Sequence, residues 1–126
     1  MYRPNNKIRV MCVDDDKEII AIYVTIFPRN GFFLSHTAYD GEVAIQIIEQ
    51  TDDTDVLILD ERMPKMSGID LAKRVRMIRP NMKIVLVSGR DIPLSDSNLF
   101  AEVLTKPAST KELVAAIRKV TKSDSG

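Results

Sequence analysis

The chain has 126 residues, of which 44% are hydrophobic, and its 18 lysines and arginines balance its 18 aspartates and glutamates. This length and apolar content suit one globular domain with its own core and exclude a largely disordered chain. The zero net charge gives no general attraction to nucleic acid or to an anionic membrane. Cys12 is the only cysteine, which excludes an internal disulfide and is typical of a reducing compartment.

The sequence predicts one folded domain between two short end segments. Residues 1–6 are expected to form a flexible leader without the apolar core of a signal peptide, and residues 7–122 to form the domain. Residues 123–126 are expected to be a frayed tail or the start of a linker. The most apolar helical stretch, Ile19–Val24, is far too short to span a bilayer, so we expect a cytoplasmic protein.

Five short segments carry the pattern of β-strands. Three of them are unbroken or nearly unbroken apolar runs, which is typical of strands that are buried on both faces of a parallel sheet. The predicted strands are Ile8–Val13, Phe32–Thr37, Val56–Leu59, Lys83–Ser88 and Glu102–Thr105.

Segments with helical spacing of apolar residues lie between and after these strands. We expect Pro28 to end the first helix. Between Gly89 and Asn98, Pro93 and several poor helix formers leave room for one short helix at best, capped by Ser95. The other predicted helices are Lys17–Phe27, Glu42–Thr51, Gly68–Arg79 and a last one that runs from the capping box Ser109-Thr110-Lys111-Glu112 to about Lys122.

Strands that alternate with helices indicate an α/β protein, in which a doubly wound parallel sheet is covered by helices on both faces. For five strands we expect the flavodoxin-like order 2-1-3-4-5, with a short or irregular fourth helix. In this order the carboxyl ends of the strands share one edge of the sheet. Five polar residues end or follow strands at this edge: Asp14, Asp15, Asp60, Ser88 and Lys106.

These five side chains have the chemistry of a phosphoryl-transfer site. Three carboxylates at one edge repel one another unless one is protonated or a cation lies among them. A set of oxygen ligands suits Mg²⁺. Lys106 brings a second positive charge and Ser88 a hydroxyl donor, and together these groups can stabilise a transferring phosphoryl group. We therefore expect Asp60 to be the nucleophile, which forms an acyl phosphate.

Other polar residues near these motifs have plainer explanations. Asp16 is expected to cap the first helix. His36, the only histidine, lies on the second predicted strand away from the site, and one histidine cannot build a metal cluster. Cys12 lies in an apolar strand and is expected to be a buried structural thiol.

Four stretches around the site form a wider pattern. They are Val13-Asp14-Asp15-Asp16, Leu59-Asp60-Glu61-Arg62-Met63-Pro64-Lys65-Met66-Ser67-Gly68, Val87-Ser88-Gly89 and Thr105-Lys106-Pro107. Each stretch alone is a weak signal, but the order of their polar residues and their places at strand ends make a strong one. In this pattern the chain resembles the receiver domain of two-component response regulators, which is CheY-like in fold, along its whole length apart from the leader and tail.

The resemblance implies a signalling switch in a phosphorelay and not an enzyme in the usual sense. Asp60 would accept a phosphoryl group from a histidine kinase or a phosphotransfer protein. The resemblance specifies neither a downstream protein nor a fused output domain, and it implies no direct contact of this domain with nucleic acid or a membrane. The chain would act alone or as part of a longer regulator.

The resemblance also implies a role for each residue of the site. Ser88 and Lys106 would bind the phosphoryl oxygens, and a cis peptide would join Lys106 to Pro107. Four residues would hold Mg²⁺: Asp15, Asp60, Arg62 through its backbone carbonyl, and Asp14 through a water molecule.

Some positions depart from the family pattern. Val103 occupies a place where receivers usually carry an aromatic residue. The segment between Ser88 and Lys106 is short for the family, and its stretch Gly89–Ala101 is altered. Glu61, Arg62 and Arg90 flank the site where family members vary. We expect the two arginines to bind the phosphoryl group or to shield it from water.

Other functions also fit a doubly wound sheet. A phosphatase of the haloacid dehalogenase type would need a second aspartate where Arg62 stands, and a flavodoxin-like cofactor site would need a phosphate loop in place of three aspartates. The sequence contains no Walker A or Gly-x-Gly-x-x-Gly motif. The remaining alternative is a receiver-fold module that binds other proteins without a phosphorylation-driven output, which Val103 and the irregular fourth helix leave open.

Overall fold

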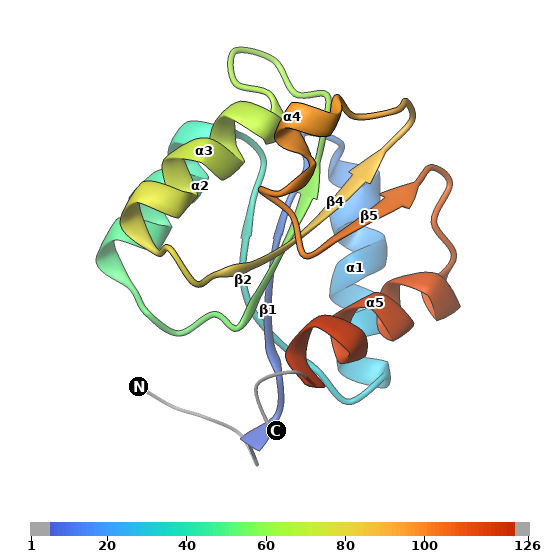
Figure 1. Cartoon of the computed structure of the whole chain (residues 1–126). Helices are drawn as coiled ribbons and strands as arrows, with labels where there is room; N and C mark the ends of the chain where they lie inside the picture. The colour runs from blue at the N-terminus through green and yellow to red at the C-terminus, as the bar shows by residue number, and fades with distance from the viewer. Residues whose placement is uncertain (1–5, 123–126) are drawn as a thin grey trace.

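The computed structural model describes residues 6–122, so residues 1–5 of the predicted leader and all of the predicted tail, residues 123–126, lie outside the described residues. A parallel five-stranded sheet in the order β2-β1-β3-β4-β5 runs between layers of helices (Figure 1). This order confirms the predicted flavodoxin-like, CheY-like fold. The strands are β1 (Arg9–Val13), β2 (Phe33–Ala38), β3 (Val56–Asp60), β4 (Lys83–Ser88) and β5 (Glu102–Thr105).

Helices cover both faces of the sheet (Figure 1). Two of them, α2 and α3, pack side by side on one face, and α1 and α5 pack on the other. Between β4 and β5 the chain forms only a single helical turn, α4. The helices are α1 (Lys17–Arg29), α2 (Gly41–Gln50), α3 (Gly68–Ile78), α4 (Leu94–Ser97) and α5 (Thr110–Lys122).

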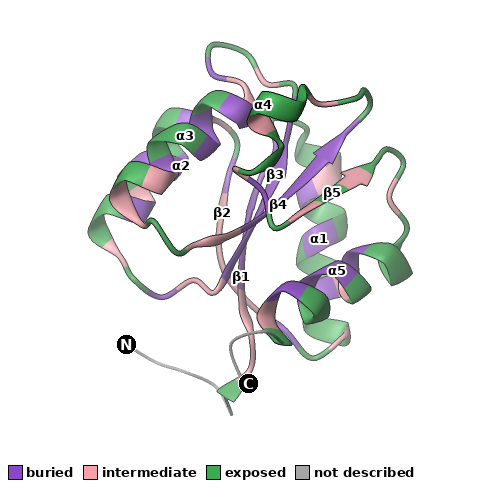
Figure 2. Cartoon of the chain, viewed as in Figure 1, coloured by how far each residue is buried: buried purple, intermediate pink, exposed green. Residues whose placement is uncertain are grey.

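The central strands are apolar on both faces because each face has its own core (Figure 2). Successive side chains of a strand point to opposite faces of the sheet. In β3, Leu57 and Leu59 therefore pack toward α2 and α3, whereas Val56 and Ile58 pack toward α1 and α5. This arrangement explains why the sequence of the strand is a continuous apolar run and not an alternating one.

The first helix is longer than predicted, because Pro28 lies inside α1 and does not end it. The φ of proline is compatible with a helix, and α1 continues for one residue beyond Pro28, to Arg29. The side-chain amide of Asn30 donates to the carbonyl oxygen of Ile26 at 2.7 Å. Gly31, with a φ of 87°, then turns the chain toward β2.

The fourth helix is as short as predicted, but Ser95 does not cap it. The N-cap residue is Pro93, and within the described structure no side chain makes a capping hydrogen bond there. None of the residues of α4 is buried (Figure 2). With neither a cap nor a buried face, the segment has little to stabilise more than one turn.

Two of the longer helices, α1 and α5, begin with the caps that the sequence predicts. Asp16 accepts a hydrogen bond from the backbone N–H of Glu18 at 2.9 Å and caps α1. Ser109 and Glu112 form the predicted capping box of α5, with reciprocal bonds of 2.9 and 3.1 Å. No helix between residues 6 and 122 combines the length and apolar character that crossing a membrane requires.

Candidate functional site

The structure brings the five predicted site residues to one edge of the sheet. Asp14 and Asp15 follow β1, Asp60 ends β3, Ser88 ends β4 and Lys106 follows β5. The strands are all parallel, so their carboxyl ends meet at this edge. The sheet order places β1 beside β3, which sets the aspartates of the first strand next to Asp60.

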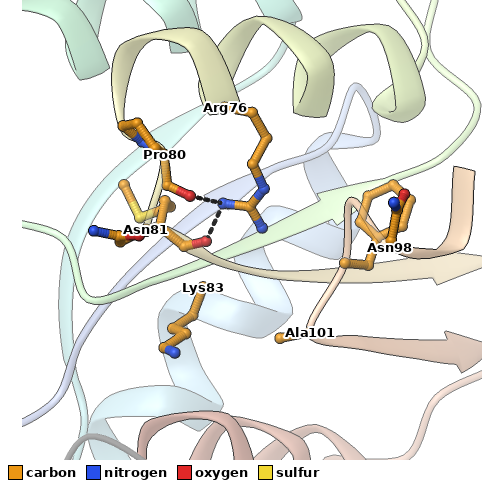
Figure 3. A pocket seen from close by; sticks show the side chains of 8 residues that line it. Arg76, Pro80, Asn81, Lys83, Asn98 and Ala101 are labelled. Carbon is orange, nitrogen blue, oxygen red and sulfur yellow. Dashed lines mark hydrogen bonds between the residues drawn. The ribbon is translucent and has the colours of Figure 1, made fainter.

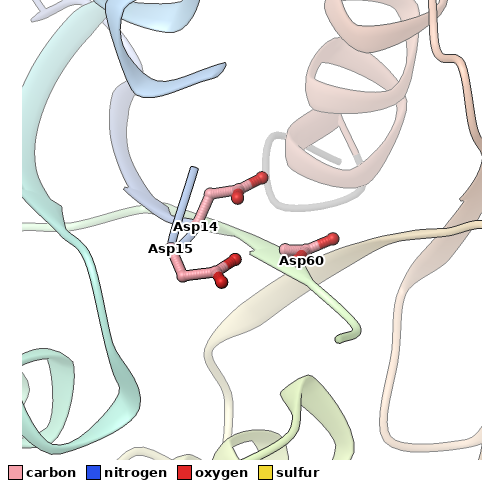
Figure 4. Close-up of side chains that lie close together, drawn as sticks. All are labelled: Asp14, Asp15 and Asp60. Atoms are coloured by element: carbon pink, nitrogen blue, oxygen red, sulfur yellow. The ribbon is translucent and has the colours of Figure 1, made fainter. Parts of the chain in front are cut away.

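Three carboxylates form the centre of this edge. One oxygen atom from each of Asp14, Asp15 and Asp60 lies within 4.8 Å of the other two (Figure 4). Asp14 and Asp60 are only 3% and 4% exposed, whereas Asp15 is open to solvent. Negative charges that are this close and this buried need a compensating positive charge.

Lys106 supplies one such charge. Its Nζ contacts Oδ1 of Asp60, although β3 and β5 are separated in the sheet by β4. The backbone N–H of Lys106 donates to the carbonyl oxygen of Ser88 at 2.8 Å, which fixes the start of the loop. Burial alone would lower the pKa of Lys106, but the hydrogen bond and negative charge of Asp60 raise it above its ordinary value. The ammonium is therefore charged at neutral pH.

The pKa of Asp14 is raised by its surroundings. Burial, together with the charges of Asp60 and Asp15, raises it from 3.8 to about 6. The backbone N–H of Asp16, which donates to Oδ1 of Asp14 at 2.9 Å, and the charge of Lys106 act in the opposite direction. Burial is thus the main cause of the raised pKa of Asp14, and the two neighbouring carboxylates add to it.

Gly68 allows α3 to begin close to the end of β3. Its N–H donates to the carbonyl oxygen of Glu61 at 2.9 Å. A Cβ atom at this position would collide with the carbonyl oxygen of Asp60 and would lie 3.0 Å from Cα of Glu61. A residue without a side chain is therefore required behind Asp60.

The donor set of the site suits Mg²⁺. Carboxylate oxygens are the ligands that this cation prefers, and one or two of them usually complete a site together with water and phosphate. Oδ1 of Asp60 is buried and meets no donor among residues 6–122 beyond its ion pair with Lys106. A divalent cation beside it would offset the mutual repulsion of the three clustered carboxylates.

A cavity of about 790 Å³ opens beside the carboxylates. Its acidic side is formed by the three clustered aspartates and Asp16, and Arg62 and the chain around Pro107 also border it. The isoleucines of α1 provide an apolar side, and Ile22 is half exposed. The Lys106–Pro107 peptide is cis, as the resemblance implies. The site can thus be approached by a partner with both charged and apolar groups.

The hydroxyl of Ser88 is engaged in hydrogen bonds with Arg90. Its Oγ donates to the carbonyl oxygen of Arg90 at 2.8 Å and accepts from the N–H of Arg90 at 3.1 Å. Ser88 is also buried. In this conformation the hydroxyl is thus bonded to the loop that follows β4.

The structure adds an ion pair that the sequence analysis did not identify. The guanidinium of Arg90 donates to the carboxylate of Glu61, and Glu61 is only 3% exposed. The sequence places both residues just beyond the ends of predicted strands that are neighbours in the sheet. Their opposite charges at neighbouring strand ends were the sequence signal that could have predicted this ion pair.

Two residues with plainer predictions lie away from the site. His36 Nε2 is 2.9 Å from Oδ1 of Asp53, in the loop before β3, which gives the histidine a structural partner. Cys12 is buried under α1 and α5, and burial raises the pKa of its thiol well above the ordinary value. Cys12 is therefore a packed core residue.

A second cavity, of about 600 Å³, lies at the opposite edge of the sheet (Figure 3). Arg76 of α3 and Lys83 are among the residues that line it, and Arg76 donates to the carbonyl oxygens of Pro80 and Met82. The same guanidinium donates to the carbonyl oxygen of Leu99 at 2.6 Å. Arg76 thus connects the loops before β4 and β5.

Fold and site together define a doubly wound α/β domain with an acidic, lysine-containing site at the carboxyl edge of its sheet. A profile of the response regulator receiver domain matches residues 10–118, and the chain belongs to this family. It is therefore a receiver domain of the kind that two-component signalling systems use.

Known relatives agree with this assignment. The transcriptional regulatory protein CpxR of Escherichia coli strain K12 is 33% identical over 117 residues, which cover 89% of this chain and 48% of CpxR. The chain thus spans about half the length of that relative. The Francisella response regulator 1452 receiver domain is 30% identical, with a TM-score of 0.84 over 94% of this chain and 99% of that one.

A third relative comes from a complex. In the CheX–CheY–BeF3–Mg complex of Borrelia burgdorferi, the matching chain is 25% identical, with a TM-score of 0.81 over 90% of this chain and 88% of that one.

Proposed function

We propose that this receiver domain takes a phosphoryl group from a phosphohistidine onto Asp60, and that the acyl phosphate is its signalling state. The observation that carries the proposal is the cluster of three carboxylates within 4.8 Å, with Lys106 in contact with Asp60. Of the three, Asp60 is the carboxylate that pairs with the ammonium, and it borders the cavity through which a donor can approach.

The transfer is a displacement at phosphorus. A carboxylate oxygen of Asp60 forms a bond to the phosphorus atom while the bond from phosphorus to the donor nitrogen breaks. The electron pair of the broken bond stays on the imidazole nitrogen of the donor, and the product is a mixed anhydride. Hydrolysis of this anhydride restores the carboxylate, so the domain acts as a switch and not as a turnover enzyme.

Residues around Asp60 would bind the group being transferred. The ammonium of Lys106 would move from the carboxylate to a phosphoryl oxygen, and the hydroxyl of Ser88 would donate to another. The lysine is already held against the acceptor, whereas the serine must first leave its bonds to Arg90. The two residues thus differ in how far they are prepared for the transfer.

Mg²⁺ would supply positive charge to the phosphoryl oxygens during transfer. Asp15, Asp60 and the backbone carbonyl of Arg62 would hold it, and Asp14 would bind through a water molecule. The arrangement of the three carboxylates supports this assignment. The Borrelia burgdorferi complex, whose name includes both BeF3 and Mg, supports it from a relative.

We propose a histidine kinase or a histidine phosphotransfer protein as the donor. The half-exposed Ile22 and its neighbours on α1 give such a partner an apolar surface beside Asp60. We place this exchange in the cytoplasm, which the single buried cysteine fits. The receiver would then act on an output domain or a separate protein, as the description of CpxR as a transcriptional regulator suggests.

The proposal is tested by intact-mass measurement after incubation with Mg²⁺ and phosphoramidate, a small donor with a nitrogen–phosphorus bond. We expect a single phosphoryl adduct on the wild-type protein and none on Asp60→Asn or in the presence of EDTA. Asp16→Asn is the matched control, because it removes a neighbouring carboxylate while asparagine keeps the cap of α1. It should form the adduct as the wild type does.

Two results would contradict the proposal. An adduct on Asp60→Asn would assign the nucleophile to another residue. A folded wild-type protein that binds Mg²⁺ but forms no adduct would favour the alternative, a module that binds proteins without phosphorylation.

A further inference from the structure

The hydroxyl of Ser88 has no hydrogen left for a phosphoryl group in this conformation. It donates its only hydrogen to the carbonyl oxygen of Arg90, at 2.8 Å, and accepts from the N–H of the same residue. A phosphoryl oxygen has no hydrogen to donate, so Ser88 can bind one only by giving up the bond to Arg90. The position of the Arg90 backbone therefore controls whether the Ser88 hydroxyl can donate to a phosphoryl oxygen.

The side chain of Arg90 is attached to Glu61, the residue after Asp60. Glu61 is the fixed end of this pair, because its N–H donates to Val87 at 3.2 Å and its carbonyl oxygen accepts from Gly68 at 2.9 Å. Its carboxylate is buried, so it depends strongly on its guanidinium partner. The side chain of Arg90 is 58% exposed and can move at little cost.

We infer that Glu61 and Arg90 are positioning residues that hold Ser88 away from the acceptor until Asp60 is phosphorylated. The inference rests on the proposed function. In the resting protein the Glu61–Arg90 pair keeps the backbone of Arg90 on the Ser88 hydroxyl. Phosphorylation breaks this arrangement and releases Ser88 toward the phosphoryl group.

Charge provides the reason for the release. Phosphorylation replaces the single negative charge of the Asp60 carboxylate, next to Glu61 along the chain, with a phosphoryl group of roughly −1.5 to −2 if it titrates as phosphorylated side chains do. This group competes with the singly charged Glu61 for the guanidinium of Arg90 and offers it more acceptor oxygens. Because Arg90 is the mobile end of the pair, it is the residue that changes partner.

This pair also provides a connection that does not pass through β5. Val103 of β5 stands where receivers usually carry an aromatic ring, so no ring at this position could respond to a movement of Ser88. The side chain of Val103 is partly exposed. The hydrogen bonds of the Ser88 hydroxyl instead run to the backbone of Arg90 in the loop before α4, and the side chain of Arg90 binds Glu61 beside the acceptor. The β4–α4 loop thus connects the Ser88 hydroxyl to the residue beside the acceptor.

The test follows the backbone amide of Arg90 by ¹⁵N NMR in the full chain, before and after phosphorylation with phosphoramidate and Mg²⁺. We expect this resonance to move on phosphorylation of the wild type. In unphosphorylated Glu61→Gln it should already lie part of the way along the same line, because a neutral amide holds the guanidinium less strongly and the released state is populated. Phosphoramidate should also modify Glu61→Gln about tenfold faster, the size expected when one hydrogen bond to a charged group is weakened.

Controls separate this role from general stability. Arg90→Met breaks the pair from its exposed end. Because this variant changes residue 90 itself, the amide resonances of Ser88 and Gly89 are followed, and they should move in the same direction as in Glu61→Gln. Arg90→Lys, which keeps the positive charge, should leave them at their wild-type positions. Glu42→Gln removes another Glu–Arg pair, the exposed one with Arg74, and should change neither the resonances nor the rate.

The outcomes distinguish the inference from the function on which it rests. An adduct on the wild type with an unmoved Arg90 amide, or wild-type resonances in Glu61→Gln and Arg90→Met, would overturn the inference alone. Absence of any adduct on the wild type would overturn the proposed function and the inference with it.

Discussion

The ammonium of Lys106 contacts Oδ1 of Asp60 across the end of a strand that lies between their own strands. Asp60 ends β3 and Lys106 follows β5, with β4 between them. The lysine thus connects the loop that follows the last strand to the proposed acceptor. Because the carboxylate is buried, removal of the ammonium would leave a buried charge without its partner, which costs more than breaking an exposed ion pair.

Replacement of Lys106 by methionine should slow formation of the phosphoryl adduct by about a hundredfold, the size typical of the loss of one preorganised donor. The rate is measured by intact mass at fixed phosphoramidate and Mg²⁺. Lys111→Met, which removes an exposed lysine near the start of α5, should keep the wild-type rate. Equal rates for the wild type and Lys106→Met would show that the ammonium plays no part in the transfer.

Asp14 should make the metal-free protein less stable as the pH rises. The pKa of Asp14 is about 6 in the folded protein, compared with an ordinary value of 3.8 that we take for the unfolded chain. The folded state therefore binds the proton more tightly than the unfolded state does. Stability from this group is fully present below about pH 4 and is lost as the pH rises through about 6. The loss should be at most about 3 kcal/mol.

Urea unfolding in EDTA between these pH values measures this effect, with Asp14→Asn as the comparison. Asparagine cannot ionise, and its side-chain oxygen can still accept from the N–H of Asp16. The difference in unfolding free energy between the two proteins should therefore shift in favour of Asp14→Asn as the pH rises. A difference that does not change with pH would contradict the raised pKa.

Mg²⁺ should stabilise the folded protein, because the folded chain gathers three carboxylates that are dispersed when it unfolds. At a concentration about 100 times the dissociation constant, the gain in unfolding free energy should be about 2.7 kcal/mol. The gain is measured by urea unfolding with and without MgCl₂. Asp15→Asn should lose most of it and Asp16→Asn should keep it; an equal gain in both would exclude Asp15 as a ligand.

Gly68→Ala should destabilise the protein by about 1–3 kcal/mol, as expected for an added methyl group in a packed place. Its Cβ would collide with the carbonyl oxygen of Asp60, so the adduct should also form more slowly. Gly89→Ala is the matched control, since a Cβ there has no neighbour within 4 Å. Thermal unfolding and the adduct rate are compared; if the two variants behave alike, close packing behind Asp60 is not important.

The sequence by itself determined the sheet and the place of the site. Continuous apolar runs such as Val56–Leu59 are stable only when both faces are covered, so they predict central parallel strands. The order 2-1-3-4-5 is the common one for a doubly wound sheet of five strands, and parallel strands present their carboxyl ends together. Asp14, Asp60 and Lys106 could be assigned to one edge for this reason, and the structure brings their side chains together there.

Only the tertiary structure decided which side chains pair with one another and whether a helix-ending residue such as Pro28 ends its helix. Ser88 bonds to the backbone of Arg90, and Glu61 is buried against the side chain of that residue, because the loop after β4 folds over the end of β3. Pro28 continues a helix that its sequence signal would end. Such outcomes depend on burial and on contacts between residues far apart in the chain, which local periodicity does not encode.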